Sequence, residues 1–130
     1  MIRKAGLLSV VLLLALAVAV WASVTLSYPV QVQTVGSNTD VRGMASQKAF
    51  MIVYSEVYRG DNNAYVKRVP GIRHWTQDDG SFAFRIATPL VFRGPSTKLH
   101  YKIHARAYSQ PSAGTEAPDL GEAVVTVYSQ

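Results

Sequence analysis

The chain contains three histidines and a pair of adjacent carboxylates, residue types that often carry catalysis or bind metal ions. The carboxylates, Asp78 and Asp79, lie in the segment TQDDGSFAFRI at residues 76–86. An Asp-Gly step between alternating runs favours a two-residue hairpin, in which Gly80, and Asp79 with modest strain, adopt positive φ angles. The carboxylates would then diverge at an exposed tip, and no further oxygen ligand follows with the spacing of a calcium loop. The segment therefore predicts a structural turn.

The histidines do not form a metal site by their spacing. His100 and His104 are four residues apart in KLHYKIHARAY, residues 98–108. On a strand rising about 3.3 Å per residue they would lie about 13 Å apart, too far for two ligands of one zinc ion. The sequence has no Gly-x-Ser-x-Gly nucleophile elbow, and its lack of cysteine excludes disulfides, thiolate metal sites and a cysteine nucleophile. We therefore expect no enzymatic activity, no cofactor and no metal.

The first 22 residues differ in composition from the rest. MIRK supplies a basic tip, and residues 5–22 form an uncharged, almost wholly apolar run, which is typical of an export or membrane signal. Three interpretations remain open: a secretory signal cut after Ala22, a membrane anchor, and a pilin-type leader. As a helix the run would span about 27 Å, just short of the ~30 Å hydrocarbon core. The stretch from Arg3 to Leu7 also resembles the processing site of archaeal type IV prepilins.

Residues 23–130 are expected to form a single exported domain. The formal charge of +5 falls to +3 without Arg3 and Lys4, because 11 basic and 8 acidic side chains remain. Export favours anionic cell-surface polymers or lipid headgroups over nucleic acid as counterparts of this mild excess. The partners we expect are further copies of the chain or other cell-surface proteins, and the membrane if residues 5–22 are retained. We expect no nucleic-acid partner.

Beyond the leader, apolar and polar residues alternate, which indicates strands with one buried face. The longest alternation predicts a strand over residues 24–32, where Pro29 indicates an edge or an interruption. Its apolar row consists of Val24, Leu26, Tyr28, Val30 and Val32.

Other segments differ from this simple alternation. Residues 49–58 begin apolar on both faces, which predicts a central strand, and residues 122–128 form a closing strand. Residues 36–43 and 110–121 are polar and rich in Gly or Pro, which indicates loops, and Pro70-Gly71 indicates a break.

Six to eight such strands predict an antiparallel β-sandwich, with a barrel as the alternative. The stretch GIRHWTQDDGSFAFRI resembles carboxypeptidase regulatory-like, Cna-B-type and transthyretin-like domains, where a threonine and an Asp-Gly turn precede alternating aromatics. The matching residues are Thr76, Asp79, Gly80, Phe82 and Phe84. The resemblance covers about residues 49–108 and implies fold without activity; fibronectin-type domains give a weaker match. The expected class is all-β, an Ig-like or transthyretin-like sandwich preceded by an N-terminal hydrophobic helix.

Two surfaces are candidates for function. The candidate surface for an anionic partner is a basic stripe formed by Arg85, His100, Lys102, His104 and Arg106, with Lys98 nearby. A solvated sheet face or a protected edge would produce the same pattern. The strand at 24–32 is a candidate donor to a neighbouring subunit, although it can equally pair within its own domain. The sequence therefore predicts a non-catalytic exported surface or filament subunit. The alternative is a monomeric secreted or anchored binding domain for glycan, peptide or anionic polymer.

Overall fold

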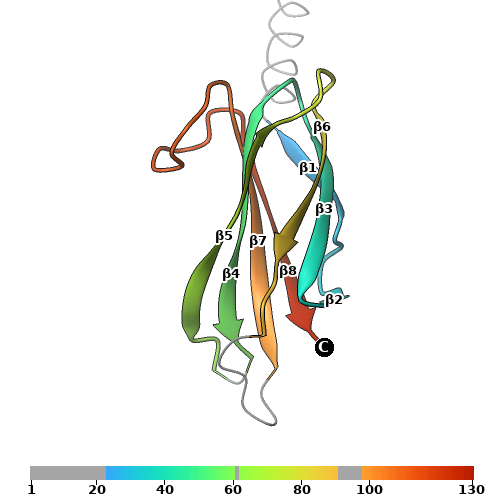
Figure 1. Cartoon of the computed structure of the whole chain (residues 1–130), viewed down its shortest axis with the longest axis vertical. Coiled ribbons are helices and arrows are strands. Elements are labelled where there is room, and N and C mark those ends of the chain that lie inside the picture. The colour runs from blue at the N-terminus through green and yellow to red at the C-terminus, as the bar shows by residue number, and fades with distance from the viewer. Residues whose placement is uncertain (1–22, 61, 91–97) are drawn as a thin grey trace, which may run out of the picture.

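The structure is a computed structural model, and it describes residues 23–60, 62–90 and 98–130 (Figure 1). Within these residues the chain is all-β with two sheets, which is consistent with a β-sandwich. The same residues contain no helix of the length and apolar character needed to cross a membrane. The leader expected at residues 1–22, with its hydrophobic helix, lies outside the described residues.

The two sheets are unequal in size. The smaller contains, in order, β1 (Val24–Tyr28), β3 (Asn38–Ala45) and β6 (Ser81–Ala87). The larger contains β2 (Thr34–Val35), β8 (Glu122–Ser129), β7 (Leu99–Tyr108), β4 (Phe50–Arg59) and β5 (Tyr65–Trp75). Neighbouring strands are antiparallel, except that β2 runs parallel to β8. The expected antiparallel arrangement therefore holds for all but this short pair.

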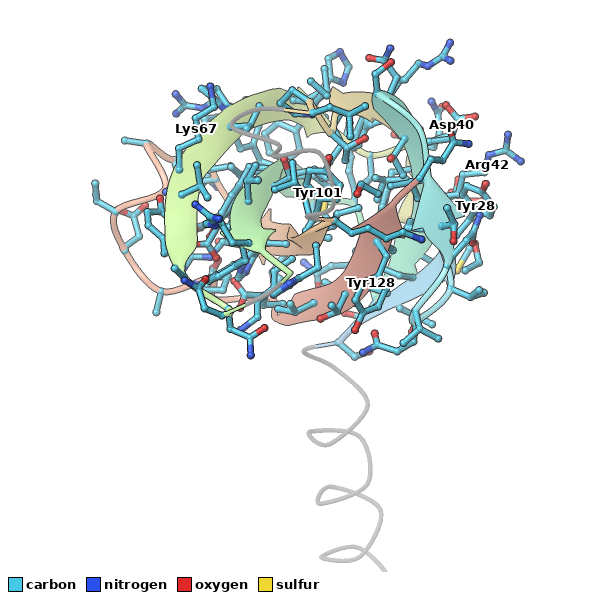
Figure 2. All side chains as sticks on the ribbon, turned by 90° about the horizontal axis from the view of Figure 1, so that it is seen from below. Tyr28, Asp40, Arg42, Lys67, Tyr101 and Tyr128 are labelled. Atoms are coloured by element: carbon cyan, nitrogen blue, oxygen red, sulfur yellow. The ribbon has the colours of Figure 1, made fainter. Side chains whose placement is uncertain are left out.

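The core lies between the sheets and uses the alternating rows that the sequence predicted. Figure 2 shows Tyr101 between the two layers. The central strand β4 is covered on both faces, as expected: Met51 and Val53 face the main core, whereas Ile52 and Tyr54 pack in a second cluster on the outer face. The inward row of β7 is fully buried and consists of Leu99, Tyr101, Ile103, Ala105 and Ala107.

The outer cluster on β4 is held under residues 109–121, the long connection between β7 and β8 that the sequence predicted as a loop. We call this connection the strap. The Tyr108 hydroxyl donates a hydrogen bond to the Glu116 carbonyl at 2.9 Å, and the Arg106 guanidinium donates to the Gly114 carbonyl at 3.0 Å. These bonds satisfy strap carbonyls and hold the strap against the larger sheet.

The loop expected at residues 36–43 is wrong, because most of this segment belongs to β3. Thr39 and Val41 are buried and point into the core, while the polar residues that alternate with them face outward, namely Asn38, Asp40 and Arg42. Gly43 continues the inward row without a side chain, since a Cβ there would lie 2.8 Å from the Phe82 ring and closer still to the backbone of β1. The polar outward residues and this glycine make the segment resemble a loop in sequence, so the strand was not predicted.

The break expected at Pro70-Gly71 is a β-bulge inside a continuous strand. The register of β5 against β4 shifts between Val69 and Ile72, so the strand runs on to Trp75. A Cβ on Gly71 would lie 1.8 Å from the Val53 carbonyl oxygen, so only glycine permits this approach.

The Asp-Gly turn joins the two sheets, so the hairpin predicted there is wrong. β5 belongs to the larger sheet and β6 to the smaller one. Gly80 has φ of 91°, and its N–H donates to the Gln77 carbonyl at 2.9 Å. Asp79 keeps a negative φ and accepts hydrogen bonds from Ser81, at 2.9 Å from the N–H and 2.6 Å from the hydroxyl. The prediction that Asp79 and Gly80 form a structural turn is confirmed, although the turn connects two sheets instead of two paired strands.

The two sides of the sandwich are sealed differently. On one side the chain passes from β1 in the smaller sheet to β2 in the larger, along the edge of β8. Val32 N–H donates to the Thr126 carbonyl at 2.8 Å, and Tyr128 N–H donates to the Gln33 carbonyl at 2.9 Å. We call this the closed side. On the other, β5 and β6 are joined by the turn at 76–80, and no described strand pairs with their outer edges (Figure 1). We call this the open side.

Candidate interaction surfaces

The predicted basic stripe is only partly assembled. His100, Lys102, His104 and Arg106 all point outward from β7, in the middle of the larger sheet. Arg85 lies instead on β6 in the smaller sheet, where its Nε is 3.7 Å from an Asp40 oxygen. The structure therefore brings four of the five residues together and leaves the fifth on the other layer.

Aromatic rings on the neighbouring strand β4 stack on the imidazoles of the stripe. The rings of Tyr54 and His104 are parallel within 6°, with centroids 4.7 Å apart. Those of Tyr58 and His100 are parallel within 5°, with centroids 5.1 Å apart, and the Lys102 ammonium lies 5.1 Å from the Tyr58 centroid. Each pair faces across the β4–β7 ladder, where directly opposite side chains come into contact. The imidazoles are therefore stacked side chains of a packed face.

Two carboxylates oppose most of the positive charge of the stripe. Glu56 Oε1 lies 2.5 Å from His104 Nε2. Glu122 Oε2 lies 2.7 Å from Arg106 Nε, close enough for an ion pair although the N–H is not aligned for a hydrogen bond. Sequence reasoning missed both acids, since their contacts depend on strand register. The signal that could have found them is that both acids occupy outward-facing positions in the alternating patterns of β4 and β8.

Burial changes the protonation behaviour of this face. Desolvation, aided by the positive charge of Lys102, lowers the pKa of His100 below its ordinary value of 6.5. Desolvation also raises the pKa of Tyr54 above 10.0, although the nearby guanidiniums of Arg68 and Arg106 oppose the effect. His100 therefore stays neutral at neutral pH, and Tyr54 stays protonated.

Among the described residues, no group of three or more His, Asp or Glu side chains is placed to hold a metal ion. Asp78 reaches the Lys48 ammonium at 3.3 Å, but 95% of its side chain is exposed. Asp79 serves the turn, and the hydrogen bonds from Ser81 lower the pKa of its carboxyl below 3.8. His74 lies on β5, with its ring centroid 6.3 Å from that of Phe84.

The candidate donor strand is shorter than expected, and β1 pairs with β3 of its own chain. A bulge after Leu26 turns Tyr28 to the outer side of the smaller sheet, where the Arg42 guanidinium carbon lies 6.0 Å from its ring centroid (Figure 2). Val30 and Val32 follow the interruption at Pro29 and remain 59% and 63% exposed. The single row predicted over residues 24–32 is therefore split, with only Val24 and Leu26 packing on the core.

Exposed apolar side chains gather on the closed side. Val32 lies beside Thr126 of β8, and Val124 and Tyr128 flank that threonine on the outward row of the same strand. Val124 is 47% exposed and Tyr128 is 40% exposed. We call the group formed by Val30, Val32, Val124 and Tyr128 the closed-side patch.

The open side carries an aromatic groove of about 350 Å³ between the edges of β5 and β6. The Phe82 and Phe84 rings stack within it, with centroids 5.6 Å apart. This groove could not be predicted from local sequence pattern, because its walls come from strands in different sheets. Its lining consists of Ile72, His74, Trp75, Gln77, Ser81, Phe82, Ala83 and Phe84.

Comparisons of this chain with protein-family models, with curated proteins and with solved structures gave no match.

Proposed function

We propose that this protein is a non-catalytic exported subunit with an immunoglobulin-like sandwich, and that it self-assembles by docking the closed-side patch of one copy on the open-side groove of the next. The leader-like residues 1–22 support export. The observation that carries the proposal is the outer edge of β6, which pairs with no described strand and lies beside an aromatic groove.

The strand order supports the immunoglobulin-like assignment. In constant-type domains a sheet of strands A, B, E and D faces a sheet of C, F and G. Here β1, β3 and β6 correspond to A, B and E, and β4, β7 and β8 correspond to C, F and G. Near the start of β7, the Tyr101 hydroxyl donates to the Pro89 carbonyl at 2.9 Å, which matches the tyrosine corner of such sandwiches.

The position of strand D supports association at the open side. No described strand lies beside β6, where D would complete the smaller sheet. Edge strands of this kind accept strands from other chains unless charge, proline or a bulge protects them. β5 has all three forms of protection, including Pro70 and the adjacent bulge, whereas β6 carries only the charge of Arg85. Of the two edges that border the groove, the edge of β6 is therefore the less protected.

The two surfaces are on opposite sides, which makes the association heterologous. A patch that fits a different surface on the next copy generates an open chain of subunits unless the rotation closes a ring. Burying the closed-side patch removes exposed apolar area from water at about 25 cal/mol per Å². The proposed contact therefore gives filament growth a driving force without strand donation by β1.

The proposal is tested with two single substitutions in the full-length chain, purified in mild detergent. Ala83→Lys places a charge at the groove, and Val32→Asp places one in the patch. Both positions are exposed, and Val32 has φ of 59°, a conformation that aspartate tolerates better than valine, so neither substitution should lower the melting temperature much. Sedimentation velocity should show oligomers for the unmodified chain and monomers for both variants. Thr25→Lys, on the outer face of β1, is the control and should still assemble.

Mixing the two variants gives a sharper result. The Val32→Asp chain keeps an intact groove and the Ala83→Lys chain keeps an intact patch, so one contact between them remains. The mixture should form heterodimers and nothing longer. A monomeric unmodified chain, or a mixture that stays monomeric, would contradict the proposed contact.

A second candidate function, a binding domain for an anionic polymer, is favoured by one observation. The outer face of the larger sheet displays ordered aromatic and cationic side chains, including the stacked Tyr54–His104 and Tyr58–His100 pairs. Since Glu56 and Glu122 oppose much of its positive charge, this face gives only weak general attraction for anions. Specific binding would need cations that these acids do not engage.

A further inference from the structure

Two arginines on β5 flank a small cleft on the outer face of the larger sheet. The cleft has a volume of about 200 Å³ and opens where the β5 bulge passes the strap. It is lined by Ile52, Tyr54, Arg68, Pro70, Gly71, Ile72, Arg73 and Ala113. Drug-sized ligands occupy roughly 300–1,000 Å³, so this cleft fits one charged substituent and the ring that carries it.

The fold holds both guanidiniums in place. The Arg68 guanidinium carbon lies 3.8 Å from the Tyr54 ring centroid, and the same ring stacks on His104. The Arg73 guanidinium donates a hydrogen bond to the Ser112 carbonyl of the strap. Ordering of this kind lowers the entropic cost of binding, because the side chains are already fixed before the ligand arrives.

The positive charge of the cleft is not neutralised by the acidic side chains near it in the described part of the chain. Glu56 stands opposite Arg68 in the β4–β5 register, but its Oε1 is engaged by His104. No ion pair joins Arg68 or Arg73 to a carboxylate in the described part of the chain. Planar guanidiniums match carboxylate and sulfate oxygens in a bidentate manner, which gives both strength and geometry.

We propose that this cleft binds one oxyanion group, a carboxylate or a sulfate, of an acidic polysaccharide, with Arg68 and Arg73 as the two donors. The bulge and Pro70 prevent an added strand from pairing here, which disfavours an extended acidic peptide as the ligand. The choice of a polysaccharide rests on the proposed export of the chain. The site itself is separate from the assembly surfaces, because none of the closed-side patch lines it and Ile72 is the only residue shared with the groove.

The test measures binding of the full-length chain to immobilised alginate, which carries carboxylates, and dextran sulfate, with uncharged dextran as the blank. Arg68→Gln should weaken binding at least about tenfold, because one charge-assisted contact is lost. Lys67→Gln removes the same charge from the adjacent residue, which pairs with the inward-facing Val57 and therefore points to the other face of the sheet. This variant should change affinity less than about twofold. Arg68→Lys keeps the positive charge but lacks the planar guanidinium that makes bidentate contacts, so the loss of affinity should be intermediate.

Three results would overturn the proposal: no binding to either acidic polymer, equal losses for Arg68→Gln and Lys67→Gln, or full retention of affinity by Arg68→Gln. Preference for one polymer over the other identifies whether the group is carboxylate or sulfate. Repeating the measurement on the Val32→Asp chain separates this site from assembly. Binding that persists in that monomeric chain supports the cleft whether or not the subunits polymerise, whereas binding lost there belongs to the assembled form and contradicts the proposed site.

Discussion

The closed and open sides of the sandwich are sealed by different parts of the chain. On the closed side, backbone hydrogen bonds hold the chain that crosses between the sheets to β8, through the parallel β2–β8 pairing and through residues 32 and 33. On the open side aromatic side chains fill the space between β5 and β6, whose backbones pair with no described strand there. Side-chain substitutions should therefore lower the free energy of unfolding more on the open side than on the closed side.

The largest difference is expected between Phe82 and Val35, which are both 6% exposed. Phe82→Ala removes a ring that packs over Gly43 and should lower the free energy of unfolding by about 3 kcal/mol. Val35→Ala removes two carbon atoms beneath the β2–β8 pair and should cost about 1.5 kcal/mol. Urea denaturation of the full-length variants measures both. Equal losses would mean that the two sides are sealed alike.

Two glycines test the backbone on either side. Gly71→Ala on β5 places a Cβ against the Val53 carbonyl and should destabilise the fold by about 2 kcal/mol. Gly36 lies between β2 and β3 on the closed side, and a Cβ there meets nothing within 4 Å. Gly36→Ala should be neutral or slightly stabilising, because it restricts the unfolded chain. Thermal unfolding of both variants measures these two changes in stability. An unchanged stability in Gly71→Ala would show that the bulge can shift to accommodate the added Cβ.

His100, between Tyr58 and Tyr128 on the face beside β8, should make stability depend on pH. Its folded pKa is lowered by burial and Lys102, so the unfolded state binds more protons below pH 6.5. The contribution is fully present above about 6.5 and is lost as pH falls through the folded pKa. His100→Gln should reduce the change in melting temperature between pH 8 and 5. His74→Gln on β5 is the control and should leave that change as it is in the unmodified chain. An unchanged slope in His100→Gln would assign the dependence to other groups.

The smallest effect is expected at the open-side turn. The hydrogen bonds from Ser81 lower the pKa of the fully exposed Asp79, so its contribution is present above about pH 3.8 and is lost as the pH falls through the folded value. Ser81→Ala removes the hydroxyl donor and should reduce the fall in melting temperature between pH 5 and 2. If Ser81→Ala and the unmodified chain lose stability in parallel, the hydroxyl has no role in the acid response.

The parts of the fold that could be predicted from sequence are the strands with apolar rows. β7 and β8 alternate cleanly, and β4 is apolar on both faces, so burial alone identifies them. β3 was not predicted because its first three outward positions are the polar Asn38, Asp40 and Arg42 and because Gly43 interrupts the inward row. β5 was divided at Pro70-Gly71 because a bulge and a chain break have the same local composition.

The candidate surfaces were less accessible to sequence reasoning than the strands. The outward parity of His100 to Arg106 was predicted correctly, but the acids that oppose them come from β4 and β8 and depend on register. Arg85 was grouped with them because parity along one strand does not say which sheet that strand joins. The groove and the cleft depend on how separate strands approach one another, which local pattern does not encode.

The parallel pairing of β2 with β8 has a mechanical consequence. β1 begins at the upper end of the sandwich and β8 ends at the lower end (Figure 1). A pull applied between residues 23 and 129 therefore acts along the strands, and the bonds joining β2 and residues 32 and 33 to β8 are loaded in shear. Bonds loaded in shear must break together, whereas a hairpin pulled from its open end loses them one at a time. A domain tethered at these two points would resist stretching up to a sharp rupture force.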